Sequence, residues 1–248
     1  MNNNFDRVPR LTKDQLDLIH SKTVDVLENT GMWICSERAR DIFKNHGFKI
    51  KGEIVYFTGK QIESALKTVP SQFTIKARNP KNDVVIGGEE CVFSNNAGAP
   101  YIMDHQGKFR LSDSKDFHNF LKINQSLDAI NITREMVSSA GDINPVNTLL
   151  YETLWQMKLT DKPVNAVFPE GIGLLSTLFG ISKEKMKEGV SKRIGYGLGN
   201  LNPRSPLALE ASQCERCIEL SIYGVPIMTD LLLYRVCLLL RMQKFWEQ

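Results

Sequence analysis

Hydrophobic positions in the first third of the chain recur at helical spacing, between residues that commonly begin and end helices. Helices are expected to begin after each N-terminal capping signal, and Gly31 and Gly47 are expected to end the first two. A short strand at 54–57 precedes the third. The capping signals are Thr12 with Gln15, Ser36, and Thr58 with Gln61.

The hydrophobic period changes to two between residues 73 and 111. Phe73, Ile75 and Ala77 alternate with polar neighbours, which is typical of a strand with one buried face. Turn residues separate the further apolar runs, so the segment predicts a meander of short strands. These runs lie at 84–86, 91–93, 101–103 and from Phe109 onward.

From Ser112 onward, helical stripes of apolar residues alternate with short apolar strands. Four consecutive helix–strand units predict an α/β fold with a parallel sheet and right-handed crossovers. The stripes run from Phe117 to Leu127, Leu150 to Met157, Ser182 to Val190 and Leu207 to Ile222. The strands are expected at 130–132, 164–168, 194–198 and 225–228.

Polar residues follow each of these four strands. In parallel α/β sheets, ligands bind at the carboxyl ends of the strands, so these side chains would converge if the sheet closed into a barrel. The competing hypothesis is that they are polar because loops face water. The polar residues are Arg134 and Glu135 after the first strand, Glu170 (preceded by Pro169) after the second, Asn200 and Asn202 at the end of the third, and Asp230 at the end of the fourth.

Other motifs carry less chemistry. Cys214 and Cys217 have the spacing of a zinc half-site, but they lie within a helical stripe and no second CxxC completes a site, which favours buried thiols. His105 falls in a turn and is expected to face solvent. The glycines of 195–199 lie within a predicted strand and do not support a dinucleotide-binding motif. We assign no metal ligand.

Composition narrows the class of protein. The 248 residues include 31 Lys and Arg against 28 Asp and Glu, a net charge of +3, with 42% apolar and 24% charged residues. These values exclude a disordered chain and a strongly basic nucleic-acid binder. The N-terminal segment is polar, and the five cysteines are odd in number and scattered along the chain, so neither a signal peptide nor a disulfide framework is expected. The apolar run at 231–240 is too short to span a membrane. These features predict a cytoplasmic protein without a membrane partner.

Several short segments, taken in their order along the chain, resemble the trimethylamine methyltransferase family. This is the corrinoid-dependent group that includes glycine betaine methyltransferases. The resemblance extends from Leu11 to about Leu232. The segments are Leu11–Leu16 with its helix to Gly31, Phe73–Pro80, Val85–Gly88, Asn96–Asp104, Thr160–Pro163, Ser205–Leu207 and Gly224–Pro226.

This resemblance implies a (β/α)8 barrel preceded by a helical and β-rich elaboration. Family members transfer a methyl group from a methylated amine to the Co(I) corrinoid of a separate protein, so no cofactor is expected to bind this chain directly. Carboxylates or aromatic faces at the barrel mouth would hold the cationic amine. The resemblance assigns no catalytic residue in this sequence. The substrate-binding candidates are Glu135, Phe168, Glu170, Asn200, Asn202 and Asp230, with Asn95, Asn96, Asp104 and Arg134 in second rank.

The chain departs from the family in length, because members are roughly twice as long. We therefore expect a partial barrel of about four units at 112–230, an elaboration at 1–111 and an atypical tail at 231–248. The tail predicts a frameshift or premature stop near residue 232. It would leave the last strand with an unpaired edge, which self-association could cover.

Two hypotheses for function stay open at this point. The chain is either a truncated methylamine or betaine methyltransferase, or a non-catalytic module or inactive fragment. A module would bind a corrinoid protein or an intact paralogue.

Overall fold

The computed structural model describes residues 11–88, 91–95, 98–134, 137–164, 169–186, 193, 199–229 and 238–240. The chain divides into two compact units, which we describe separately. The first comprises Met1–Pro70, Asn200–Ile218 and Ile227–Gln248, and the second comprises Ser71–Gly199 and Glu219–Pro226.

Three helices of the first unit begin where the capping signals predict. They are α1 (Lys13–Asn29), α2 (Glu37–Asn45) and α3 (Gly59–Leu66). The Gln15 backbone N–H donates to the Thr12 hydroxyl at 3.3 Å, and the Thr12 N–H donates to the Gln15 side chain at 2.9 Å. Gly31 ends α1 with φ of +75°, and an added Cβ would lie 2.7 Å from the Val55 carbonyl oxygen. The predicted helices are confirmed.

A four-stranded sheet of order β2-β3-β1-β9 forms the centre of this unit. Its strands are β1 (Met32–Ile34), β2 (Lys49–Lys51), β3 (Ile54–Tyr56) and β9 (Ala208–Leu209). The pairs β2–β3 and β3–β1 are antiparallel, whereas β9 runs parallel to β1. The buried core against the sheet consists of Ile34, Ala39, Val55, Cys214 and Ile218.

The prediction that a helix starts at Leu207 is wrong. Leu207 has φ of +66° and precedes β9, and α8 (Ala211–Ile222) begins four residues later. Trp33 is the pairing partner of Ala208. The sequence pattern missed this strand because its partner is distant in the chain and Leu207 happens to lie one helical repeat before Ala211.

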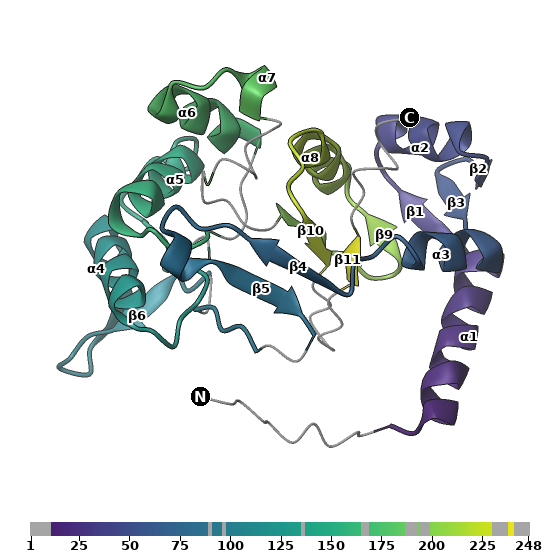
Figure 1. Cartoon of the computed structure of the whole chain (residues 1–248), viewed down its shortest axis with the longest axis horizontal. Helices are drawn as coiled ribbons and strands as arrows, with labels where there is room; N and C mark the ends of the chain where they lie inside the picture. The colour runs from purple at the N-terminus through teal and green to yellow at the C-terminus, as the bar shows by residue number, and fades with distance from the viewer. Residues whose placement is uncertain are drawn as a thin grey trace. The chain divides into compact units, whose positions relative to one another are not determined.

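Two hairpins open the second unit, as the alternating pattern predicts (Figure 1). β4 (Gln72–Ile75) pairs antiparallel with β5 (Val84–Gly87) around the short 3-10 helix η1 (Pro80–Asn82). β6 (Tyr101–Met103) pairs antiparallel with β7 (Phe109–Leu111). Four helices follow along the chain, namely α4 (Ser114–Ser126), α5 (Thr148–Leu159), α6 (Pro169–Phe179) and α7 (Lys183–Met186).

Parallel pairing occurs as single bridges in this unit. Ser94 pairs with Ile132, and Thr133 pairs with Val164. The run at 91–93, expected to belong to the meander, therefore leads into the first strand of the parallel ladder, one strand earlier than predicted. Its hydrophobic pattern cannot distinguish these two partners, because both bury one side of a strand.

Strand β10 (Ile227–Thr229) overlaps the strand predicted at 225–228, and β8 (Gly199–Asn200) lies just after the strand predicted at 194–198. The N–H groups of Gly199 and Leu201 donate to the carbonyls of Pro226 and Met228 at 2.8 and 2.9 Å, a stagger typical of parallel strands. The described residues thus form a mixed α/β structure with no closed barrel among them, and the partial barrel is not confirmed.

The edge expected to be unpaired is covered. β11 (Leu238–Leu240) pairs antiparallel with β10, with Ile227 opposite Leu240 and Thr229 opposite Leu238. The expectation was wrong because the apolar run in the tail can itself form a strand. Parts of two predicted elements, at 165–168 and 187–190, and the whole strand predicted at 194–198 lie outside the described residues. No helix within the described ranges is long and apolar enough to cross a membrane.

A buried lysine joins the start of the ladder to the end of α4. Lys162 is 6% exposed, and its Nζ donates to the carbonyl oxygens of Asn124, Leu127 and Ile130, each at 2.7 Å. Burial lowers the pKa of this ammonium group, against the attraction of nearby aspartates. The cation replaces the missing hydrogen bonds at a helix C-terminus, where positive charge is favoured.

We expect Lys162→Met to destabilise the fold by about 2–4 kcal/mol, because it leaves three carbonyl groups without their charged donor. Urea unfolding would measure the loss. Lys122→Met, at an exposed position of α4, is the matched control and should change stability by less than about 0.5 kcal/mol. Equal effects of the two substitutions would contradict this role.

Candidate functional site

The carboxyl ends of the parallel segments form the candidate site. The N–H groups of Asn131 and Ile132 donate to the Phe93 carbonyl at 2.8 and 3.2 Å. The Asn131 side chain in turn accepts the Phe93 N–H at 2.9 Å. One step further along, the Arg134 N–H donates to Oδ1 of Asn95 at 2.8 Å. The structure therefore brings together two of the second-rank candidates, Asn95 and Arg134.

The next strand joins the same ladder through its backbone. The Thr133 N–H donates to the Pro163 carbonyl at 2.9 Å, and Thr133 is fully buried. Its Oγ1 has no hydrogen-bond partner among the described residues. Ile132 and Val164, at 4% and 2% exposure, surround this backbone with apolar side chains. The Thr133–Val164 side of the ladder is therefore buried, whereas Phe93 and Ser94 on its other side are exposed.

A polar network anchors residues 160–161, just before the strand that pairs with Thr133 through Val164. The Asp161 carboxylate accepts hydrogen bonds from the side chains of Asn79, Asn82 and Gln125 at 2.9, 2.7 and 2.8 Å. Burial raises the pKa of Asp161, but these donors outweigh burial, so its pKa lies below the ordinary value. Arg78 donates to the Thr160 carbonyl. The sequence marks 160–163 only as a segment similar to the family, and no local pattern predicts this network, because its donors lie far apart in the chain.

Glu170 occupies the first turn of α6 and is exposed. An acidic side chain there interacts favourably with the positive end of the helix dipole, which gives Glu170 a structural role beside any binding role. Asn200 is half-buried in β8, and its Oδ1 has no partner among the described residues. The N–H of Asn202 donates to the Gln213 side chain at 2.7 Å.

The remaining candidates divide into two groups. Asp104 lies in the turn between β6 and β7, where Oδ1 accepts the N–H groups of Gln106 and Lys108 at 2.9 and 3.0 Å. These bonds account for an aspartate in that turn. His105 beside it is exposed, as expected. Four candidates lie outside the described residues, namely Asn96, Glu135, Phe168 and Asp230.

The cysteine pair has the properties of buried thiols. Cys214 and Cys217 are 6% and 3% exposed and lie in α8. Burial raises their pKa to about 11 and about 12, respectively. Within the described ranges, no group of three or more His, Cys, Asp and Glu side chains could hold a metal ion. Desolvated, protonated thiols are poor metal ligands.

The family profile described as "Trimethylamine methyltransferase (MTTB)" matches residues 1–229. The chain belongs to this family.

Named relatives are similar over different lengths. A glycine betaine methyltransferase of Desulfitobacterium hafniense (strain Y51) is 42% identical over 113 residues, covering 46% of this chain and 24% of that protein. A trimethylamine methyltransferase of D. hafniense (strain DSM 10664 / DCB-2) is 27% identical over 223 residues, covering 86% and 44%. An L-carnitine:corrinoid methyltransferase of Eubacterium limosum is 25% identical over 185 residues, covering 74% and 37%.

A solved structure, the monomethylamine methyltransferase of Methanosarcina barkeri, gives a TM-score of 0.48 at 11% identity, over 84% of this chain and 55% of that chain. The chain spans about half the length of the curated relatives it matches.

We expect Asn95→Leu to destabilise the ladder by about 1 kcal/mol or more, because the Arg134 N–H loses its acceptor. Asn95→Asp keeps an acceptor oxygen at that place and should lose less. Chemical unfolding of both variants would measure the difference. If the leucine variant were as stable as the aspartate variant, the hydrogen bond would not matter to the fold.

We expect Cys214 and Cys217 to react with a maleimide about ten-fold or more slowly than the half-buried Cys35 and Cys91 at neutral pH. The thiolate is the reactive form, and burial keeps both helical thiols protonated. Mass spectrometry of native and denatured chain would locate the labels, and elemental analysis should find no stoichiometric zinc. Rapid native labelling of either residue would contradict this assignment.

Proposed function

We propose that this chain acts in the transfer of a methyl group from a methylated amine to the Co(I) corrinoid of a separate protein. The observation that carries the proposal is the family match across residues 1–229. The corrinoid belongs to the partner and is a substrate here. The L-carnitine relative is named for the same class of acceptor.

The transfer requires the C–N bond to break with its electron pair left on nitrogen, while a Co–C bond forms. The positive charge of the amine makes it a leaving group, so the protein must hold a cation and exclude water. The hydrogen-bonded ladder that ends at Asn95 and Arg134 supports this role, because it fixes where the following loops begin. We propose Glu135, Phe168, Glu170, Asn200, Asn202 and Asp230 as residues that contact the amine.

The amine is proposed to be of the glycine betaine type. The relative named for that substrate is 42% identical over the region it matches, against 27% for the relative named for trimethylamine. A betaine is a zwitterion, so a positive group such as Arg134 near its carboxylate would be compatible with binding.

A second candidate function is a non-catalytic module that binds the corrinoid protein. The observation that favours it is length, since the matched regions make up 24%, 44% and 37% of the three relatives. Binding to the corrinoid protein without methyl transfer distinguishes this candidate from the enzyme.

If the proposal holds, the full 248-residue chain should convert Co(I) to methylated corrinoid when supplied with glycine betaine and a Co(I) corrinoid protein. The change in the corrinoid absorption spectrum would measure it. Light scattering and a cooperative thermal melt would first establish that the chain is folded. A folded chain that produces no methylated corrinoid would contradict the enzymatic proposal, and co-sedimentation with the corrinoid protein would then test the binding module.

Substitution of Glu170 tests the binding assignment. Glu170→Gln should weaken betaine binding about ten-fold, the loss expected for one charge-assisted contact. Glu37→Gln is the matched control, because Glu37 is also an exposed acid in the first turn of a helix. Both variants lose the same helix-dipole interaction, so an equal effect on binding would count against Glu170.

A further inference from the structure

The hairpin of β6 and β7 in the second unit carries its apolar side chains on an exposed face. Figure 1 shows β6 beside α4. The register pairs Tyr101 with Leu111 and Met103 with Phe109, and residues two apart in a strand share a face. These four residues therefore lie together on one side of the hairpin, and they are 56%, 64%, 63% and 69% exposed, in that order. We call them the apolar face of the hairpin.

The opposite face of the hairpin is half-buried and carries the charge. Arg110, the only charged residue of the two strands, pairs with Ile102 in the register, and both are half-buried. The Arg110 guanidinium donates to both carboxylate oxygens of Asp116 at 2.6 and 2.8 Å. These hydrogen bonds hold the pKa of Asp116, in the first turn of α4, below its ordinary value. Antiparallel sheets usually bury their apolar face and expose their polar one, so this hairpin is inverted.

Hydrogen bonds close the turn of the hairpin. The Asp104 N–H donates to the Lys108 carbonyl at 3.1 Å, and the Gly107 N–H donates to the Asp104 carbonyl at 2.9 Å. Gly107 has φ of +81°, a conformation that favours glycine. The Asp104 side chain also accepts two N–H groups of the turn. These contacts fix the register of the two strands and keep the apolar residues on one side.

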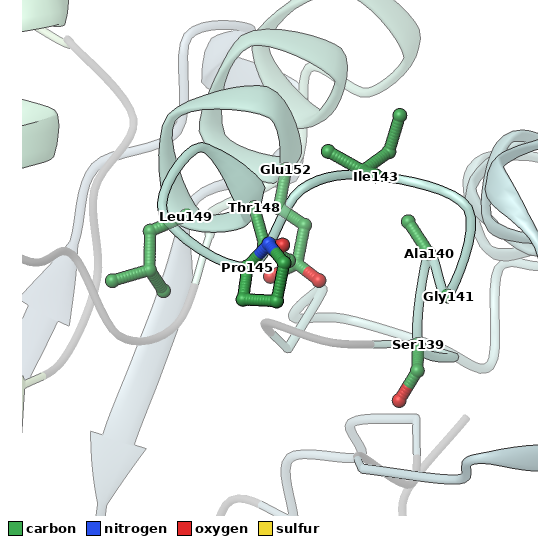
Figure 2. A pocket seen from close by; sticks show the side chains of 8 residues that line it. All are labelled: Ser139, Ala140, Gly141, Ile143, Pro145, Thr148, Leu149 and Glu152. Carbon is green, nitrogen blue, oxygen red and sulfur yellow. The ribbon is translucent and has the colours of Figure 1, made fainter.

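The base of the hairpin is fixed as well. The Ser112 N–H donates to the Pro100 carbonyl at 3.0 Å. Ser139 and Gly141, which line an open pocket beside α5 (Figure 2), donate their N–H groups to the carbonyls of Ala99 and Ser112 at 3.1 and 3.2 Å. An added Cβ at Gly141 would lie 2.9 Å from the Ser112 oxygen, so this close approach requires glycine. The apolar face is thus preorganised, and little conformational entropy remains to be lost on binding.

The apolar face differs from the single exposed hydrophobic residues that any protein surface carries. Isolated residues of that kind are normal, whereas a contiguous apolar patch bordered by polar residues marks an interaction surface. Polar residues border this patch at both ends, in the turn at 104–108 and at 112–113 before α4. The two cross-strand pairs therefore form a docking surface.

The area of the face sets the strength of the contact. The four residues are about two-thirds exposed, and a large side chain buries roughly 200 Å², so one hairpin would contribute on the order of 500 Å². Two such faces would together bury about 1,000 Å², which is the lower limit for a specific interface. A contact of two hairpins is therefore sufficient for association, but it is expected to be weak.

The chemistry of the face favours a second copy of this chain as the partner. A two-fold axis brings the same surface of both copies together, so an apolar face needs only its own copy as a complement. The charge of the hairpin lies on its other side, in the ion pair of Arg110 and Asp116. The net charge of +3 is small, so two copies can approach without strong repulsion.

We propose that the apolar face of the β6–β7 hairpin binds the same face of a second copy of this chain in a two-fold symmetric dimer. The hairpins pack face to face, as two sheets pack in a sandwich. The dimer does not depend on the proposed methyl transfer, because the hairpin forms its face whether the chain is an enzyme or a binding module.

The test is sedimentation velocity of the full chain between about 1 and 100 μM. The mass is expected to change from one chain to two across this range, because an interface near the lower limit of area gives a weak, reversible dimer. A folded chain that stays monomeric at the highest concentration would overturn the proposal.

Substitution of Phe109 tests whether the hairpin forms the interface. Phe109→Asp should raise the dissociation constant of the dimer at least about ten-fold, because it buries an unpaired charge, whereas Phe109→Leu should retain most of the association. Val146→Asp is the matched control, since it introduces the same charge at an exposed apolar residue of the second unit outside the hairpin. The control should dimerise as the unaltered chain does.

A second variant guards against misfolding of Phe109→Asp. Tyr101→Asp alters the other cross-strand pair and should weaken the dimer to a similar extent, with circular dichroism and a cooperative melt showing that each variant is folded. A dimer that persists in both folded variants, or that Val146→Asp weakens equally, would overturn the proposal. A chain that stays monomeric but binds the corrinoid protein through Phe109 would assign the face to that partner and would also overturn it.

Discussion

A single buried ammonium group connects the helical and extended parts of the second unit. Lys162 donates to three carbonyl oxygens, two of which belong to the end of α4 and the turn after it, and the third to Ile130 at the start of the next strand. Such a group costs several kcal/mol to desolvate unless it is fully hydrogen-bonded, so the three carbonyls and the lysine must be placed together. The path of the chain from α4 into the ladder is thereby fixed.

The candidate site depends on this junction through a short series of backbone contacts. Pro163 follows Lys162 directly, and its carbonyl accepts the Thr133 N–H. The next residue, Arg134, donates its N–H to Asn95. The hydrogen bonds in this series join groups that are buried or half-buried. Leaving one of these bonds unmade would cost more free energy than forming it gains. The loops that follow this ladder, which carry several of the strand-end candidates, therefore start from fixed points.

The sequence predicted the elements whose causes are local. The capping boxes at Thr12 and Thr58 depend on residues three apart, and the structure forms both. Pairing between strands that are distant in the sequence is harder to predict. The pattern places Leu207 in a helix, because no nearby residue indicates that Ala208 pairs with Trp33. In the site, residues at strand ends could be named from the pattern. The role of Lys162 could not be predicted, because lysine is normally exposed and only the tertiary structure shows this one buried.

Exposure decides how much an acidic side chain can contribute to holding a cation. Glu170 is exposed in the free chain, so water screens its charge there. A ligand that covers Glu170 would remove this water and strengthen the attraction between the two charges. The contribution of Glu170 to binding therefore depends on the ligand and the neighbouring side chains excluding water from the contact, rather than on the carboxylate alone.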